Sequence, residues 1–95
     1  MKIHGKYCGP NWTHGRNVPA SDYDKYPEVR PVDRLDRACQ AHDKDCSHGG
    51  CSSKGDLRLM DVALWVAVSS PDIRTRAIAT SIAVAMAGTA PTRSR

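Results

Sequence analysis

The stretch Asp33–Cys46, DRLDRACQAHDKDC, decides the fold of this 95-residue chain because it reads as one amphipathic helix. Four of its residues fall at i, i+4, i+7 and i+11 and share one inward face: Leu35, Cys39, His42 and Cys46. Asp43 borders that face. A carboxylate beside a buried imidazole is costly without a partner, so this pair predicts a metal, a salt bridge or a catalytic mechanism.

Start and stop signals predict three helices. Asp33 is placed as an N-cap, which predicts a helix over 34–47. The second helix is predicted over 56–68, with an inward stripe of Leu57, Met60, Leu64 and Val68 and with Ala63 and Ala67 beside it. The third is expected to start after an N-cap at Ser70 and to end at 88, followed by a frayed tail over 89–95.

Glycine and proline residues interrupt the first third of the chain, so residues 1–32 are predicted to be a long loop. Residues 1–95 are therefore expected to form a single all-α domain, in which a small antiparallel helix core carries this N-terminal loop. A domain of this size buries only about 60–65% of its unfolded surface, so it needs further stabilisation from disulfides or a bound metal. Four cysteines can supply it, as two disulfides or as metal ligands: Cys8, Cys39, Cys46 and Cys51. An even count in a short chain favours disulfides, and hence a secreted or otherwise extracytoplasmic protein.

Charge and hydropathy limit the possible partners. The net charge of +4 suits an anionic surface, and no basic run interleaved with aromatic residues indicates nucleic-acid binding. We therefore expect peripheral contact with a phospholipid membrane surface and no nucleic-acid partner. No apolar run reaches the ~18–20 residues of a transmembrane segment. The first residues also lack the apolar core of a signal peptide, so we expect a processed product or part of a longer precursor.

The turn between the first two predicted helices should bring a histidine and an aspartate together. Two short helices joined by a turn run antiparallel, so His42, near the end of the first, can meet Asp56, which begins the second. An aspartate bonded to one imidazole nitrogen stabilises the imidazolium and leaves the other nitrogen free to take a proton from water. This arrangement predicts a hydrolytic His–Asp pair. Asp61, one turn further along, is the alternative partner.

Asp43 then needs a different role. If Cys8 is bonded to Cys39, the segment 7–11 is held about one helical turn from Asp43, and its backbone carbonyls can converge on the carboxylate. Several oxygens around one carboxylate are typical of a Ca²⁺ site. Spacing also allows Cys46 to pair with Cys51, and the sequence leaves the connectivity open.

Three segments together resemble the secreted phospholipase A2 family. HGKYCGP at 4–10 is similar to its calcium loop, PVDRLDRACQAHDKDC at 31–46 to its catalytic helix, and GDLRLMD at 55–61 to the segment with its second catalytic aspartate. The short, helical chain is most similar to the compact forms of this family in bacteria, fungi and parvoviral capsid proteins. The resemblance therefore adds association with a virion to the expected locations of the protein. The resemblance implies calcium-dependent hydrolysis of the sn-2 ester of glycerophospholipids to a fatty acid and a lysophospholipid.

The same resemblance implies a role for each matching residue. His42 is the general base and Asp56 its partner. The Ca²⁺ ligands are the Asp43 carboxylate and three backbone carbonyls, those of Tyr7, Gly9 and Asn11.

Two alternatives remain open on the sequence. Cys46 stands where the family has a tyrosine that supports the catalytic aspartate, which allows an inactive phospholipase-like lipid-binding or toxin module. A structural zinc module is also possible, because five candidate ligands lie within thirteen residues: Cys39, His42, Cys46, His48 and Cys51.

Five further aromatic and imidazole side chains have simpler interpretations. Trp65 is expected to pack in the core, and His4, His14 and His48 are expected to face solvent from loops. Trp12 fits either an anchor at a membrane–water interface or packing within the loop.

Overall fold

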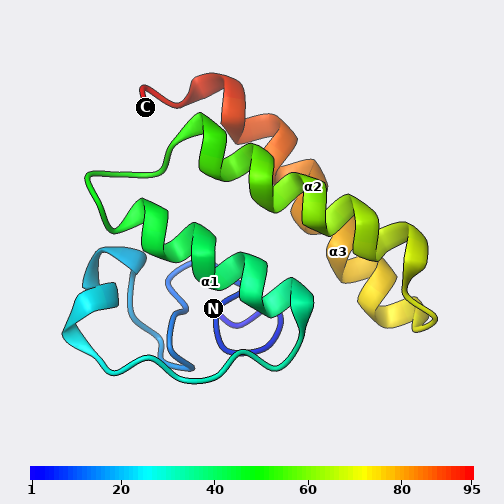
Figure 1. The fold of residues 1–95 in the computed structure, drawn as a ribbon, viewed down its shortest axis with the longest axis horizontal. Coiled ribbons are helices and arrows are strands. Elements are labelled where there is room, and N and C mark those ends of the chain that lie inside the picture. The colour runs from blue at the N-terminus through cyan, green and yellow to red at the C-terminus, as the bar shows by residue number, and fades with distance from the viewer.

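A computed structural model describes the whole chain, residues 1–95, and three α-helices dominate it (Figure 1). α1 spans Arg34–Cys46, α2 spans Ser53–Ser69 and α3 spans Ile73–Thr89. Short 3-10 helices cover Ala20–Lys25 and Ala90–Thr92. The only β-type backbone pairing consists of two isolated β-bridges in the N-terminal loop. The predicted all-α fold is confirmed.

A polar side chain caps the start of each α-helix. Asp33 accepts a hydrogen bond at 2.8 Å from a backbone N–H in the first turn of α1, as predicted. Ser52 does the same for α2 at 2.9 Å, so α2 begins three residues before the predicted start at 56. Asp72, and not Ser70, caps α3 at 2.9 Å. The carboxylate two residues further on therefore displaces the predicted cap.

α2 packs against both α1 and α3. The chain direction reverses between α1 and α2 and again between α2 and α3, and the N-terminal segment lies against α1 (Figure 1). The core draws on every part of the chain: Tyr7, Cys8, Tyr23, Leu35, Cys39, Leu59, Ala63, Val66, Ala79, Ile82 and Ala83. The sequence thus supplies an apolar face to each helix, and the N-terminal loop covers part of the core.

The inward face predicted for α2 is wrong. Three of the four residues predicted to face inward are exposed, Leu57, Leu64 and Val68, and so is Trp65, whose ring lies under the Arg34 guanidinium at 4.6 Å. The buried face consists of Leu59, Ala63 and Val66, of which Ala63 agrees with its predicted place beside the stripe. Both sets have helical spacing, so periodicity alone does not choose between them. The packing of α2 against α1 and α3 buries Ala63 completely and decides between the two sets.

A buried carboxylate anchors the N-terminal loop to α1. The Asp36 side chain is 0% exposed and accepts hydrogen bonds from the backbone N–H groups of Lys6, Tyr7 and Val32, each at 2.9 Å. Gly5 lies directly beside it: a Cβ there would be 2.3 Å from the Asp36 carboxyl carbon. Asp36 therefore holds both ends of the N-terminal loop against α1, in addition to placing a negative charge in the first turn of that helix.

A second anchor lies inside the N-terminal loop. His14, predicted to face solvent, is instead buried, with Nε2 2.7 Å from the Tyr23 carbonyl and Nδ1 3.1 Å from the Tyr7 hydroxyl. The Tyr7 hydroxyl also donates to the Val29 carbonyl at 2.6 Å. These contacts fix the conformation of the loop around Tyr7.

The C-terminal tail is folded, not frayed as predicted. Ala90 is buried, and the Arg95 carbonyl accepts a hydrogen bond from the Ser53 backbone N–H at 2.9 Å. The tail therefore lies beside the first turn of α2 (Figure 1). Within this tail, Arg93 contacts a buried carboxylate of α2, that of Asp56.

Candidate active site

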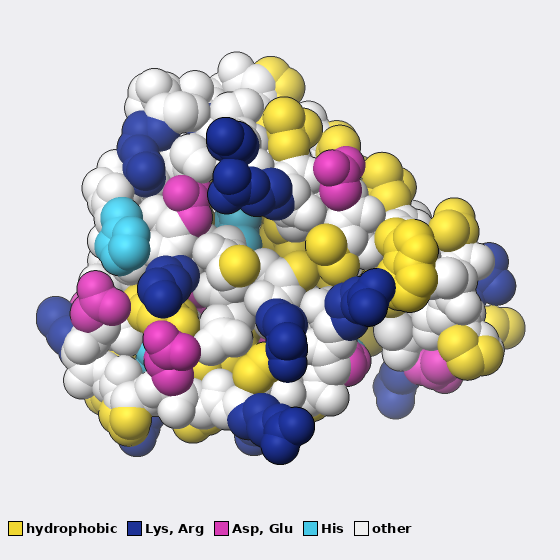
Figure 2. Space-filling model, viewed as in Figure 1, with side chains coloured by type: hydrophobic (Ala, Val, Ile, Leu, Met, Phe, Trp, Pro, Cys, Tyr) yellow, Lys and Arg dark blue, Asp and Glu magenta, His cyan; other side chains and the backbone are white.

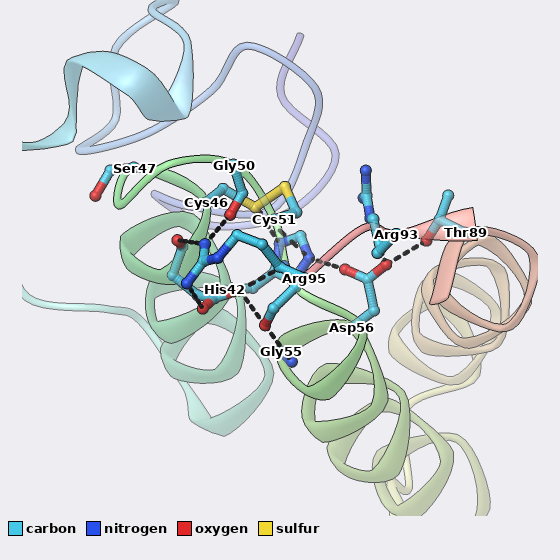
Figure 3. The surroundings of a disulfide bond; sticks show 12 residues. His42, Cys46, Ser47, Gly50, Cys51, Gly55, Asp56, Thr89, Arg93 and Arg95 are labelled. Carbon is cyan, nitrogen blue, oxygen red and sulfur yellow. Dashed lines mark hydrogen bonds and ion pairs between the residues drawn. A yellow bond between two sulfur atoms is a disulfide. The ribbon is translucent and has the colours of Figure 1, made fainter. Parts of the chain in front are cut away.

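His42 and Asp56 lie in contact at the facing ends of α1 and α2. His42 Nε2 lies 2.6 Å from Asp56 Oδ1, and the two side chains are 13% and 0% exposed (Figure 3). Because an ionised carboxylate only accepts hydrogen bonds, Nε2 carries the proton and Nδ1 is the free nitrogen. The Cys46 sulfur lies 3.8 Å from Nδ1. The imidazole is thus oriented through Nε2, while Nδ1 has no nitrogen or oxygen partner in the protein and the residue lines a cavity.

Two residues of the C-terminal segment hold the second oxygen of Asp56. Thr89 Oγ1 donates to Asp56 Oδ2 at 2.7 Å and Arg93 Nε donates to the same atom at 2.8 Å (Figure 3). Burial by itself raises the pKa of Asp56, but the hydrogen bonds from Arg93, His42 and Thr89 outweigh it and lower that pKa below its usual value. Asp56 is therefore an anion within the site.

Sequence reasoning missed Thr89 and Arg93. Thr89 is the last residue of α3 and Arg93 lies in the tail after it. They are 33 and 37 residues from Asp56 in the sequence, so no local pattern connects them to it. Together they satisfy the second oxygen of the buried Asp56 carboxylate. An arginine in a short terminal segment is most often a solvated surface charge, so the sequence carries no signal that singles out Arg93.

Asp43 is buried with an unpaired oxygen. Its residue is 8% exposed, and Oδ2 has no hydrogen-bond partner. Burial raises the pKa of Asp43 to about 8, although the nearby Thr13 hydroxyl, which lies outside hydrogen-bonding geometry, partly offsets the shift. A buried carboxylate with a bare oxygen is costly in its charged form, so it is suited to a cation that would compensate the charge.

The loop around Gly9 reaches the same cavity as Asp43. Tyr7, Gly9 and Asn11 all line it. No protein group donates a hydrogen bond to the backbone carbonyls of Tyr7 or Gly9, whereas the Asn11 carbonyl lies 3.5 Å from the Met1 ammonium. Gly9 and Asn11 have positive φ angles of 142° and 51°, conformations that glycine and asparagine tolerate best. Asp43, Tyr7 and Gly9 therefore line one cavity with an unpaired carboxylate oxygen and two backbone carbonyls that accept no hydrogen bond from the protein.

The cavity that joins these groups is mainly apolar and has a volume of about 570 Å³. His42 and Asp43 lie on its wall together with Arg93. Its apolar lining comes mainly from α2, α3 and the N-terminal segment: Ile3, Ala20, Leu59, Ile82, Ala85 and Met86. A cavity of this size and character can take an acyl chain next to the His42–Asp56 pair.

Two disulfides frame the site. Cys8 is bonded to Cys39, which ties the loop around Gly9 to α1, and Cys46 is bonded to Cys51 beside His42 (Figure 3). His42, Cys46 and Cys51 offer ligand atoms within 4.8 Å of one another, a possible metal-binding group. Since no cysteine is free, the two sulfurs can act as thiolate ligands only after reduction. A structural zinc module therefore has no support in this arrangement.

Three other residues that the sequence analysis considered, Asp61, His48 and Trp12, lie outside the site. Asp61, the alternative partner of His42, is exposed on α2 and makes no hydrogen bond through its side chain. His48 lies 3.9 Å from Asp24 on the surface, consistent with its predicted exposure. Trp12 is half-buried and donates its indole N–H to the Gly5 carbonyl at 3.0 Å, which favours loop packing.

Apolar side chains gather over one part of the surface. Figure 2 shows them along the edge formed by α2 and α3, with Lys and Arg side chains spread over the neighbouring surface. The exposed large apolar residues of these helices are Leu57, Leu64, Trp65, Val68, Ile73 and Val84. None of the helices combines the length and the hydropathy needed to cross a bilayer.

Comparison of the chain with models of protein families, with curated proteins and with solved structures finds no match.

Proposed function

We propose that this protein is a calcium-dependent phospholipase A2 that releases the sn-2 fatty acid from glycerophospholipids, as its resemblance to that family implies. The observation that carries the proposal is one apolar cavity lined by both the His42–Asp56 pair and the buried, unpaired Asp43 carboxylate. A base with a free nitrogen, a carboxylate suited to a cation and room for an acyl chain are the parts this hydrolysis needs.

The residues divide the proton transfers between them. His42 Nδ1 takes a proton from water, whose oxygen attacks the ester carbonyl carbon. Asp56, held by Thr89 and Arg93, keeps His42 oriented through Nε2 and stabilises the imidazolium that forms. His42 then gives its proton to the leaving alcohol oxygen as the ester bond breaks. No serine or cysteine nucleophile is required.

Asp43 and the backbone carbonyls of Tyr7, Gly9 and Asn11 would hold Ca²⁺. When bound, Ca²⁺ supplies a positive charge for the negative charge that develops on the ester carbonyl oxygen. The oxygen-only ligand set favours this cation over zinc, which prefers nitrogen and sulfur.

The apolar edge of α2 and α3 supports peripheral contact with a phospholipid surface, and the net charge of +4 favours an anionic one. Two disulfides in so small a chain suit a secreted or virion-associated protein. The alternative of an inactive module rests on the tyrosine missing at position 46. The hydrogen bonds from Thr89 and Arg93 to Asp56 favour an active enzyme instead.

Fatty-acid release from mixed phospholipid vesicles tests the proposal. We expect release with calcium, loss of release with excess chelator, and no release by the His42→Gln variant under either condition. Calcium-independent release, or equal release by the parent and the variant, would show that the assigned base and cation do not carry the reaction. Absence of release by the parent on zwitterionic and anionic vesicles alike would refute the assignment as a phospholipase.

A further inference from the structure

We propose that Arg93 binds a phosphate group of the ligand that enters the cavity, in addition to its contact with Asp56. As an assignment of a substrate contact, this inference rests on the proposed function above. It concerns a residue outside the segments that resemble phospholipase A2.

The guanidinium of Arg93 is held in one orientation. Its Nε donates to Asp56 Oδ2 at 2.8 Å, and Asp56 is fully buried and is itself fixed by His42 and Thr89. The Arg93 side chain is 28% exposed, so its far end is not enclosed by protein. A planar group that is anchored at one nitrogen presents its other two nitrogens in a fixed direction.

Those two nitrogens are unused. Neither Nη1 nor Nη2 of Arg93 makes a hydrogen bond or ion pair within the protein, and Figure 3 shows this end of the side chain directed away from Asp56. Arg93 lines the cavity that also contains His42 and Asp43. Paired N–H donors from a guanidinium match two oxygens of a phosphate group.

Arg93 is also the one Lys or Arg side chain on the wall of this cavity, which has 18 lining residues of which 11 are hydrophobic. In such apolar surroundings a charge-assisted hydrogen bond is stronger than in water. An anionic group that enters beside an acyl chain therefore finds a single side chain with fixed charge to bind it. The geometry selects a phosphate-bearing amphiphile over an uncharged one.

A purely structural role for Arg93 makes a different prediction. If Arg93 only positions Asp56, its loss should affect all ligands of the cavity to the same degree. If it also binds phosphate, its loss should affect phosphate-bearing ligands selectively. The comparison of two ligands with the same alkyl chain separates these roles.

The experiment measures binding of dodecylphosphocholine and dodecyl maltoside, each below its critical micelle concentration, in calcium buffer by isothermal titration calorimetry. Arg93→Gln should weaken dodecylphosphocholine binding at least about tenfold and change dodecyl maltoside binding by no more than about twofold. Arg93→Lys, which keeps the charge and protects the fold, should give an intermediate loss for dodecylphosphocholine. Arg74→Gln, an equal charge change at an exposed site on α3, is the matched control and should change neither.

Competition with inorganic phosphate identifies the source of the anion. Phosphate that displaces dodecylphosphocholine from the parent protein would assign the site to the phosphate oxygens alone. Failure to displace it, with the Arg93→Gln loss still present, would assign the site to a lipid headgroup held together with its chain. Equal weakening of both detergents in both Arg93 variants, or no weakening in either, would overturn the inference.

The binding assay needs no turnover, so the two proposals can fail separately. Selective loss of dodecylphosphocholine binding without fatty-acid release from vesicles would refute the hydrolase and retain the phosphate contact. Chelator-sensitive release combined with unselective binding losses would retain the hydrolase and refute the phosphate contact.

Discussion

Replacement of Asp43 by asparagine should change how the metal-free protein responds to pH. Burial raises the pKa of Asp43 to about 8 from 3.8, so between these values the folded state keeps a proton that the unfolded state has released. The folded state binds more protons, and the free energy of unfolding therefore falls as pH rises. For one group the slope is about 1.4 kcal/mol per pH unit.

The size of the effect follows from that slope. Between pH 5 and pH 7 the Asp43 contribution should cost about 2.7 kcal/mol of stability, which is on the order of 10 °C in Tm for a domain of this length. Asp43→Asn removes the ionisable group, so the difference in stability between the variant and the parent should grow by that amount over this range. Histidine titrations occur in both proteins and cancel in the difference.

Urea unfolding in chelator at several pH values measures this difference, and Asp61→Asn serves as the control for loss of an exposed negative charge. Calcium at 100 times its Kd should stabilise the parent by about 2.7 kcal/mol and leave Asp43→Asn nearly unchanged. If the free energies of unfolding of the parent and Asp43→Asn changed in parallel with pH, Asp43 would not be a buried, neutral carboxyl group in the metal-free protein. Equal stabilisation of both by calcium would refute Asp43 as a ligand.

Three further expectations concern the base, the loop anchor and the bridge. His42→Gln should reduce fatty-acid release by more than about a thousandfold while Tm changes by only a few degrees, since it keeps a polar group of similar size; activity within tenfold of the parent would exclude His42 as the base. Asp36→Asn should lower the free energy of unfolding by about 2–4 kcal/mol, because one amide oxygen cannot accept from three backbone N–H groups; an unchanged urea midpoint would contradict that count. Replacement of Cys8 and Cys39 by serine should weaken calcium binding while the far-UV helix signal at low temperature persists, since the loop is then freed from α1; calcium affinity equal to that of a variant lacking the other bridge would refute this coupling.

Much of the candidate site could be predicted because it is encoded locally. The spacing of Cys39, His42 and Asp43 places them on one side of a single helix, and the helix start at Asp33 is a short-range signal. Asp56 follows a short turn, so the contact with His42 needs only that the chain reverse direction. The all-α fold follows from the same local signals.

The tertiary structure decided what no local pattern encodes. Two faces of α2 have helical spacing, and the packing against α1 and α3 buries Leu59 and exposes Trp65. Asp56 obtains Arg93 as a partner because the tail folds back along α2, a contact between residues 37 positions apart. Periodicity states which residues can share a face of a helix, but the choice of face and the partner of each buried charge depend on segments that meet only when the chain has folded.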